Sequence, residues 1–193
     1  MRDDGPGRGR PLKAEATPAI LAAAFRLLAE HGVDRMTMEA VAAESGVSKA
    51  TVYRRWRSKD ELIIDAVREM GRRPPPGLGS KDPRAGAVTV LRNLAGMLAD
   101  PVAGRVLARL VAEAVGNPAL SRAWRETVVT PRRAAVATLV RRGVEAGQLP
   151  EATDVEATVD MMIGPLFYRH LVSGGPLEDL PELIVDTVWG PAR

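Results

Sequence analysis

The chain has 193 residues, 46% of them apolar, so it can bury a sizeable core without a disulfide or a metal. It contains no cysteine, which excludes a disulfide framework, a thiolate metal site and a cysteine nucleophile. No apolar run approaches the roughly 18 residues of a membrane span, and residues 1–13 lack the apolar segment of a signal peptide. We therefore expect a cytoplasmic protein with no membrane contact, no metal and no cofactor.

The net charge of +3 is unevenly distributed along the chain. Residues 1–73 carry 14 Lys and Arg against 11 Asp and Glu, whereas residues 74–193 carry 13 of each. Basic residues are densest at 46–59, where no acidic residue occurs. This pattern is typical of a surface that faces phosphates, although a charge run alone also fits a solvated basic loop.

Capping residues mark the starts of most of the expected helices. A side chain that can cap a helix is followed by proline at Thr17, Asp82, Asp100, Asn117 and Thr130, and each pair predicts an N-cap followed by the first helical residue. No convincing alternation of apolar and polar residues indicates a strand. We expect an all-α protein with helices at 16–31, 38–45, 48–55, 59–72, 83–99, 101–115, 118–129, 131–147, 154–173 and 179–189.

A segment rich in proline and glycine, residues 73–81, cannot continue a helix and marks the expected boundary between two parts. The first part comprises residues 1–73, of which 1–13 are expected to form a disordered basic arm. The second comprises residues 74–193. The helix expected at 59–72 would link the two.

Residues 37–55 predict a helix-turn-helix. Thr37 can cap a short helix that ends at Ser45, Gly46 permits a tight turn, and Ser48 can cap a second helix. On that second helix, Val52 and Trp56 define an inward face. The opposite face, with its edges and the adjacent caps, is expected to contact the major groove and the phosphates through Thr37, Ser48, Lys49, Ala50, Thr51, Tyr53, Arg54, Arg55 and Lys59.

The run from Thr37 to Leu62 resembles the DNA-binding signature of the TetR family of bacterial transcription regulators, and the resemblance spans about Ala16 to Val67. It implies that the stretch Gly46–Tyr53 enters the DNA groove. The commonest members of that family have His-Phe where this chain has Arg55-Trp56, which keeps an aromatic packing residue and adds a cation. The resemblance also implies a helical second domain with a dimer interface and an effector site.

Two amphipathic helices of the second part, at 131–148 and 154–173, could pair with their copies in a homodimer, although their periodicity alone favours an ordinary core within one chain. The predicted interface residues are Val136, Leu139, Val140, Val159, Ile163 and Leu166. The residue type of each predicted effector residue alone favours plain core. The predicted effector residues are Met97, Leu107, Val111, Trp124, Met161 and Phe167. The expected effector is small and apolar or cationic-amphiphilic, with Glu113 or Asp160 receiving a cation.

We expect no enzyme activity, because the two histidines, His31 and His170, stand outside any recognisable catalytic or zinc motif. The favoured function is a regulator, most commonly a repressor in this family, that an effector releases from a palindromic operator. The alternatives are a DNA architectural protein without sequence preference and a helical adaptor that binds no DNA. Sequence-specific binding distinguishes these possibilities.

Overall fold

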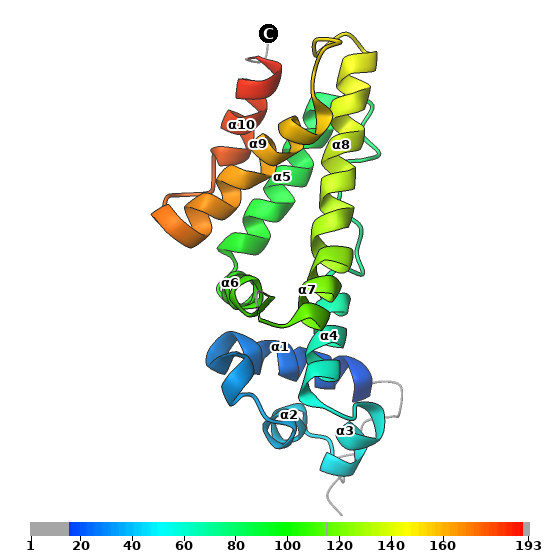
Figure 1. Ribbon diagram of the computed structural model, residues 1–193, viewed down its shortest axis with the longest axis vertical. Helices are drawn as coiled ribbons and strands as arrows, with labels where there is room; N and C mark the ends of the chain where they lie inside the picture. The colour runs from blue at the N-terminus through cyan, green and yellow to red at the C-terminus, as the bar shows by residue number, and fades with distance from the viewer. Residues whose placement is uncertain (1–15, 115, 191–193) are drawn as a thin grey trace, which may run out of the picture. The chain divides into compact units, whose positions relative to one another are not determined.

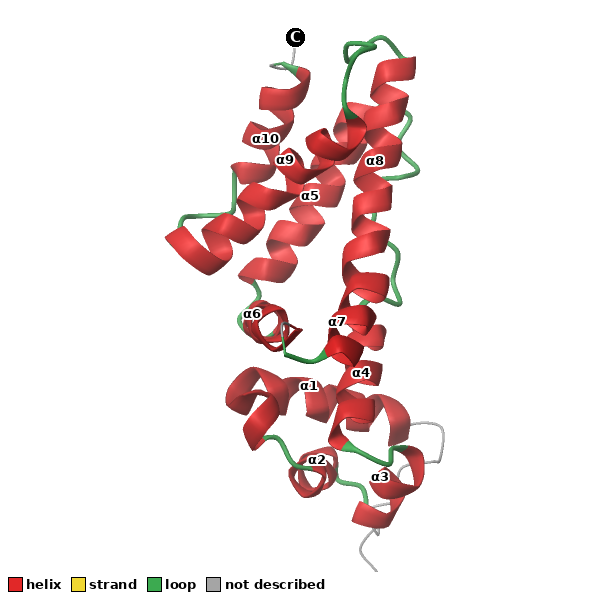
Figure 2. Ribbon diagram, viewed as in Figure 1, coloured by secondary structure: helices red, strands yellow, loops and turns green. Residues whose placement is uncertain are grey.

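The computed structural model describes residues 16–114 and 116–190, and every regular element in these ranges is helical, which confirms the all-α prediction (Figures 1 and 2). None of these helices is both long and apolar enough to cross a membrane. The elements are α1 (Ala16–Arg35), α2 (Met38–Ser45), α3 (Lys49–Arg55), α4 (Lys59–Met70), α5 (Pro83–Ala99), α6 (Ala103–Ala114), α7 (Pro118–Trp124), the π-helix η1 (Arg125–Val129), α8 (Thr130–Glu145), α9 (Val155–Tyr168), the π-helix η2 (Arg169–Ser173) and α10 (Leu180–Trp189).

The chain divides into two compact units between Ala66 and Val67, inside α4. The sequence placed this boundary near residue 73, in the segment rich in proline. The difference arises because the chain from Val67 onward groups with the second unit, in which Gly71 lies directly against Thr127. The helix α4 therefore begins in one unit and ends in the other.

The core of the first unit is formed by α1, α2, α3 and the start of α4, with α2 packed against both α1 and α3. Ile20, Val41 and Val52 have no exposed surface. Within α1, Gly32 departs from helical geometry with φ 78° and ψ 178°, a conformation that only glycine adopts without strain. The regular part of α1 thus stops where the sequence predicted.

The core of the second unit lies among α5, α8, α9 and α10, which run beside one another (Figure 1), while α6 packs against α5 and α7. Both α5 and α9 pack on α8, so the apolar face of α8 is covered by its own chain. Five of the six residues predicted at a dimer interface are therefore buried in this core, and Ile163 is half-buried. The five are Val136, Leu139, Val140, Val159 and Leu166.

Two prolines, Pro131 and Pro165, lie within continuous runs of helix. Thr130 was predicted to cap a new helix, but it has helical φ and ψ of −59° and −45°, and α7, η1 and α8 continue one another. In the wide turn of η1 the Thr130 N–H donates to the Arg125 carbonyl. The helix therefore continues through Pro131 without a break. Helix α9 likewise continues through Pro165 and ends in the second π turn, η2.

Candidate DNA-binding surface and ligand-binding unit

Hydrogen bonds to the two predicted caps fix the starts of α2 and α3. The Thr37 hydroxyl accepts from the Ala40 N–H at 3.1 Å, and the Ser48 hydroxyl accepts from the Thr51 N–H at 3.3 Å. Between them, Gly46 ends α2 with φ 69°, in the left-handed region. This confirms the predicted helix, turn and helix at residues 37–55.

The inner face of α3 is anchored in the first unit. Val52 is completely buried and Trp56, which ends the helix, is 5% exposed. The Trp56 indole N–H donates to Asp65 Oδ2 on α4 at 2.9 Å, so the ring is fixed by a polar contact as well as by packing. As predicted, Val52 and Trp56 face inward, and this sets which side of α3 is outward.

The outer face of α3 presents cations and small side chains to the surroundings. Lys49, Ala50 and Arg54 are exposed, while Thr51 and Arg55 are half-buried. Within the part of the chain that the structure describes, Arg54 makes no hydrogen bond or ion pair. The Thr51 hydroxyl lies 2.9 Å from Ser48 Oγ, so its methyl group is the part left for outside contacts.

Tyr53 is held at the edge of this face by α2. Its phenol donates to Glu39 Oε1 at 2.8 Å, although the ring is 47% exposed. The hydrogen bond lowers the pKa of the Glu39 carboxyl and raises the pKa of the Tyr53 phenol, because it favours the charged acid and the protonated phenol. The phenol has a single O–H, so a hydrogen bond from Tyr53 to a phosphate oxygen would have to replace the bond to Glu39.

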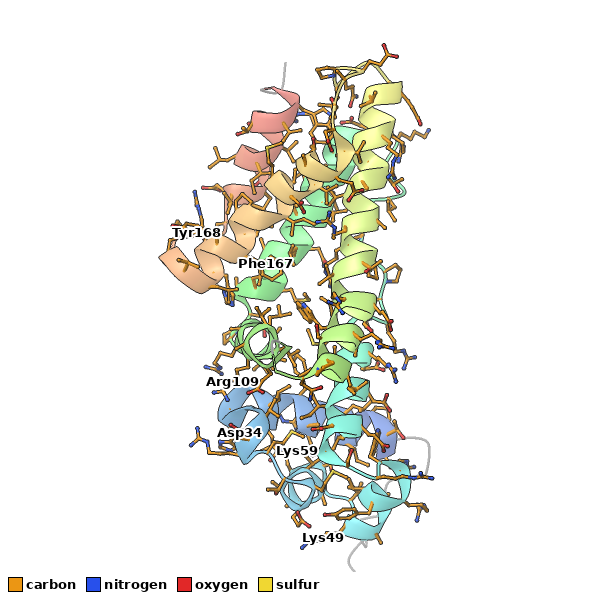
Figure 3. All side chains as sticks on the ribbon, in the orientation of Figure 1. Asp34, Lys49, Lys59, Arg109, Phe167 and Tyr168 are labelled. Atoms are coloured by element: carbon orange, nitrogen blue, oxygen red, sulfur yellow. The ribbon has the colours of Figure 1, made fainter. Side chains whose placement is uncertain are left out.

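Lys59 has an intramolecular role that the sequence did not suggest. We expected this residue to contact a phosphate, but its ammonium donates to the Val33 carbonyl at 2.7 Å and reaches the Asp34 carbonyl at 3.5 Å. Figure 3 labels Lys59 and Asp34 in the first unit, with Lys49 on α3. The lysine ties the start of α4 to the end of α1, so a phosphate would have to compete with two carbonyl oxygens for it.

The predicted effector residues do not share one environment. Leu107 and Trp124 are buried, and Met97, Val111 and Phe167 are half-buried, as expected for the core or the lining of a site inside the second unit. Met161 differs, because it is 61% exposed and lines an open groove between α9 and α10. Of the two acidic residues proposed as cation receptors, Glu113 is half-buried, whereas Asp160 is exposed and pairs with Arg133 instead.

The groove between α9 and α10 has a volume of about 510 Å³. Beside Met161 it is lined by Pro165, Leu180 and Leu183, and Leu183 is 54% exposed. Further exposed apolar side chains follow in η2 and at the end of α9, whose last residue, Tyr168, is labelled in Figure 3. Sequence reasoning missed this surface, because the same helices also carry an apolar face that is buried in their own chain. The exposed apolar residues are Met161, Tyr168, Leu171, Val172 and Leu183.

A second feature missed from the sequence is Arg132, on the first turn of α8. This arginine is only 7% exposed. Its Nη1 donates to the Val128 carbonyl at 3.2 Å, its Nη2 lies 3.3 Å from the Met97 sulfur, and its Nε meets no acceptor among the described residues. Burial lowers the pKa of the Arg132 guanidinium. No pattern in the sequence distinguishes it from Arg133, its half-buried and ion-paired neighbour.

Comparisons with known proteins agree with this geometry. Residues 20–66 match the family model for bacterial regulatory proteins of the tetR family, and residues 79–188 match the model for the tetracyclin repressor-like C-terminal domain. The uncharacterised helix-turn-helix transcriptional regulator YdeS of Bacillus subtilis is 35% identical over 187 residues, which cover 95% of this chain and 93% of YdeS.

Solved structures show the same fold. A TetR transcription regulator of Haloarcula marismortui aligns with a TM-score of 0.74 and 22% identity over 90% of this chain and 94% of that one. The transcriptional regulator FadR of Bacillus subtilis, solved with stearoyl-CoA, aligns with a TM-score of 0.78 and 18% identity over 91% and 99%. Together, the helix-turn-helix, the two matched domains and a relative similar over nearly its whole length show that the chain belongs to the TetR family of bacterial transcriptional regulators.

Proposed function

We propose that the chain is a homodimeric repressor that binds a palindromic operator through α3 and leaves it when a small effector binds in the second unit. It acts in the cytoplasm by binding alone, without catalysing a reaction. The observation that carries the proposal is the division of α3 into a buried face, Val52 and Trp56, and an exposed face with Lys49, Ala50 and Arg54.

The roles on α3 follow from exposure and chemistry. Arg54 is long, exposed and without a partner among the described residues, so its guanidinium is suited to pair bidentately with a guanine in the major groove. Ala50 and the methyl group of Thr51 are suited to apolar contact with a thymine methyl. Lys49, at the start of the helix, would bind a phosphate and set the position of α3.

Selection of bound duplexes from a random DNA library tests this assignment. Wild type should enrich a palindrome whose half-sites are one helical turn apart, about 34–36 Å. Arg54→Ala should relax the base preference at one position of each half-site, and the control Arg26→Ala changes an exposed arginine on α1 that pairs with Glu44. Binding without enrichment, with a steep salt dependence, would instead support an architectural protein, and no binding would support an adaptor.

A second copy of this chain is the occupant we propose for the groove between α9 and α10. The exposed apolar residues Met161, Tyr168, Leu171, Val172 and Leu183 lie on these helices and on η2, and apolar patches of this kind mark association surfaces. A palindromic operator also needs two helix-turn-helix units, one for each half-site. This surface replaces the interface predicted from the sequence, five of whose residues are buried in the core of the chain.

The oligomeric state tests this surface. Analytical ultracentrifugation should show a dimer for wild type and a monomer for Leu183→Glu. The control Leu78→Glu places the same charge at an exposed leucine outside α9, η2 and α10, and should leave the dimer intact. Dimeric Leu183→Glu would place the interface elsewhere.

The second unit is the proposed effector site, and α4 is the proposed link to DNA. Half-buried Met97 and Phe167 and buried Leu107 and Trp124 favour an apolar or amphiphilic ligand. The stearoyl-CoA in the structure of FadR is amphiphilic, which agrees with that ligand class. Helix α4 begins in the first unit and ends in the second. An effector that moves the C-terminal end of α4 would therefore change the position of the helix-turn-helix.

A further inference from the structure

We propose that Arg132 is the receptor for an anionic head group, a carboxylate or a phosphate, on the effector of this protein. The inference rests on the proposed function, because it assigns the chemical class of the ligand that the second unit binds. It also reverses the charge of one of the two ligand classes expected from the sequence, the cationic amphiphile that Glu113 or Asp160 would receive.

Arg132 is buried without an ionic partner among the described residues. A guanidinium stays charged in proteins, and charged side chains are almost never this deeply buried unless they are paired. Here the exposed fraction is 7%, and no carboxylate lies within ion-pair distance among the described residues. Burial is the sole cause of the lowered pKa of this group, so no nearby charge offsets the loss of water around it.

One edge of the Arg132 guanidinium, formed by Nε and Nη2, has no oxygen acceptor among the described residues. In an arginine, Nε–H and Nη2–H point the same way and form the edge that takes both oxygens of a carboxylate or phosphate. On Arg132 this edge has no acceptor at Nε and only the thioether of Met97 at Nη2, while the fixed contact to the Val128 carbonyl uses Nη1. A thioether is a weak acceptor on a flexible side chain, so an anion can displace it.

The surroundings define the rest of the ligand. Trp124, Val128 and Arg132 follow one another at steps of four residues along the continuous helix of α7, η1 and α8, and all three are buried. The guanidinium is therefore the charged end of an otherwise apolar row. A ligand with an anionic head and an apolar body matches that row.

Other arginines of the second unit show what a structural arginine looks like in this protein. On the same helix, Arg142 donates to the carbonyls of Leu78, Ser80 and Lys81, and its contacts close the segment before α5. Arg133, next in sequence to Arg132, pairs with Glu156 and Asp160. Arg132 alone of these three combines deep burial with an edge that lacks an oxygen acceptor.

Thermal unfolding of the ligand-free full chain is the first test. Arg132→Met replaces a buried cation with an apolar side chain of similar length, so it should leave the midpoint unchanged or raise it by a few degrees. The control Arg142→Met removes a donor to three carbonyls and should lower the midpoint. An equal fall in both variants would make Arg132 a structural residue and overturn the proposal.

Calorimetric titration is the second test. The probes are straight-chain carboxylic acids of six to twelve carbons, phenylacetic acid and indole-3-acetic acid, each beside its primary amide, together with decyl phosphate. At least one anion should bind wild type at least tenfold more tightly than its neutral counterpart or, for decyl phosphate, than decanol. Arg132→Met should lose that preference and Arg132→Lys should keep part of it. Preference for the carboxylates or for decyl phosphate identifies the head group. No preference for any anion, or the same preference in Arg132→Met, overturns the proposal.

Operator affinity, measured on the selected duplex without ligand, separates this proposal from the proposed function. Wild type and Arg132→Met should bind that duplex equally. Specific DNA binding without anion preference would refute the anion site and leave the regulator standing. Anion preference without any specific DNA binding would support the site and refute the proposed function.

Discussion

Replacement of Gly71 by alanine should destabilise the second unit, because no room exists for a methyl group where the end of α4 meets η1. A Cβ at residue 71 would lie 2.3 Å from both the Cγ2 and the backbone carbonyl oxygen of Thr127. The carbonyl oxygen belongs to a helix and cannot rotate away, so relief requires the end of α4 and η1 to separate by about 1 Å, since ordinary contacts begin at 3.4 Å.

The expected loss is about 1–3 kcal/mol of unfolding free energy, the usual range for inserting a methyl group into a packed site. For a protein of this size that corresponds to a fall of roughly 2–12 °C in the unfolding midpoint. Calorimetry, with circular dichroism at 222 nm as a second probe, measures the shift.

Gly96→Ala is the matched control. Gly96 lies inside α5, where an added Cβ would meet nothing within 4 Å. Alanine is a better helix former than glycine by about 1 kcal/mol, so this variant should be more stable than wild type by roughly 2–4 °C. A Gly71→Ala midpoint equal to or above that of wild type would refute the close packing of α4 on η1.

Three further changes test the first unit. Glu39→Gln should lower the pKa of the Tyr53 phenol toward its ordinary value, because the Glu39 carboxylate raises that pKa in wild type. Spectrophotometric titration of the two tyrosines measures the change. A titration curve identical to that of wild type would contradict the hydrogen bond between Tyr53 and Glu39. The hydrogen bond between Tyr53 and Glu39 also makes stability depend on pH, because it shifts both pKa values on folding. Its contribution to stability is present above the ordinary carboxyl pKa and below about pH 10. It is lost when acid protonates Glu39 or when alkali ionises Tyr53. Thr37→Ala should lower the free energy of unfolding by about 1 kcal/mol, because it removes the cap of α2. Thr37→Ser keeps the hydroxyl and should leave the free energy of unfolding nearly unchanged in denaturant unfolding. Equal losses in both variants would show that the hydroxyl does not act as the cap. Lys59→Met should lower the free energy of unfolding by about 1 kcal/mol and leave the salt dependence of operator binding unchanged. Lys49→Met should instead reduce the slope of log affinity against log salt concentration by about one. The same reduction in Lys59→Met would show that Lys59 contacts a phosphate.

The sequence by itself determined the helices of the first unit and the faces of α3. Thr37, Gly46 and Ser48 act on backbone groups within three residues of themselves, so their effect is local and can be predicted without the tertiary structure. The burial of Val52 and Trp56 follows from the same helical period.

The tertiary structure decided how the amphipathic helices of the second unit are used. Periodicity shows that α8 and α9 have apolar faces, but which face meets its own chain depends on α5 and α10, whose positions are set by contacts between residues far apart in sequence. The passage of α7 into α8 at Pro131 likewise depends on the π turn η1 rather than on the local capping pattern.

The charge of the proposed effector site depended on tertiary structure for the same reason. Arg132 and Arg133 are adjacent and chemically identical, yet one is buried against Val128 and Met97 and the other pairs with acids of α9. Rotation by about 100° between successive helical residues places them on different faces, and only the packing of α5 and α9 on α8 determines which face is inside.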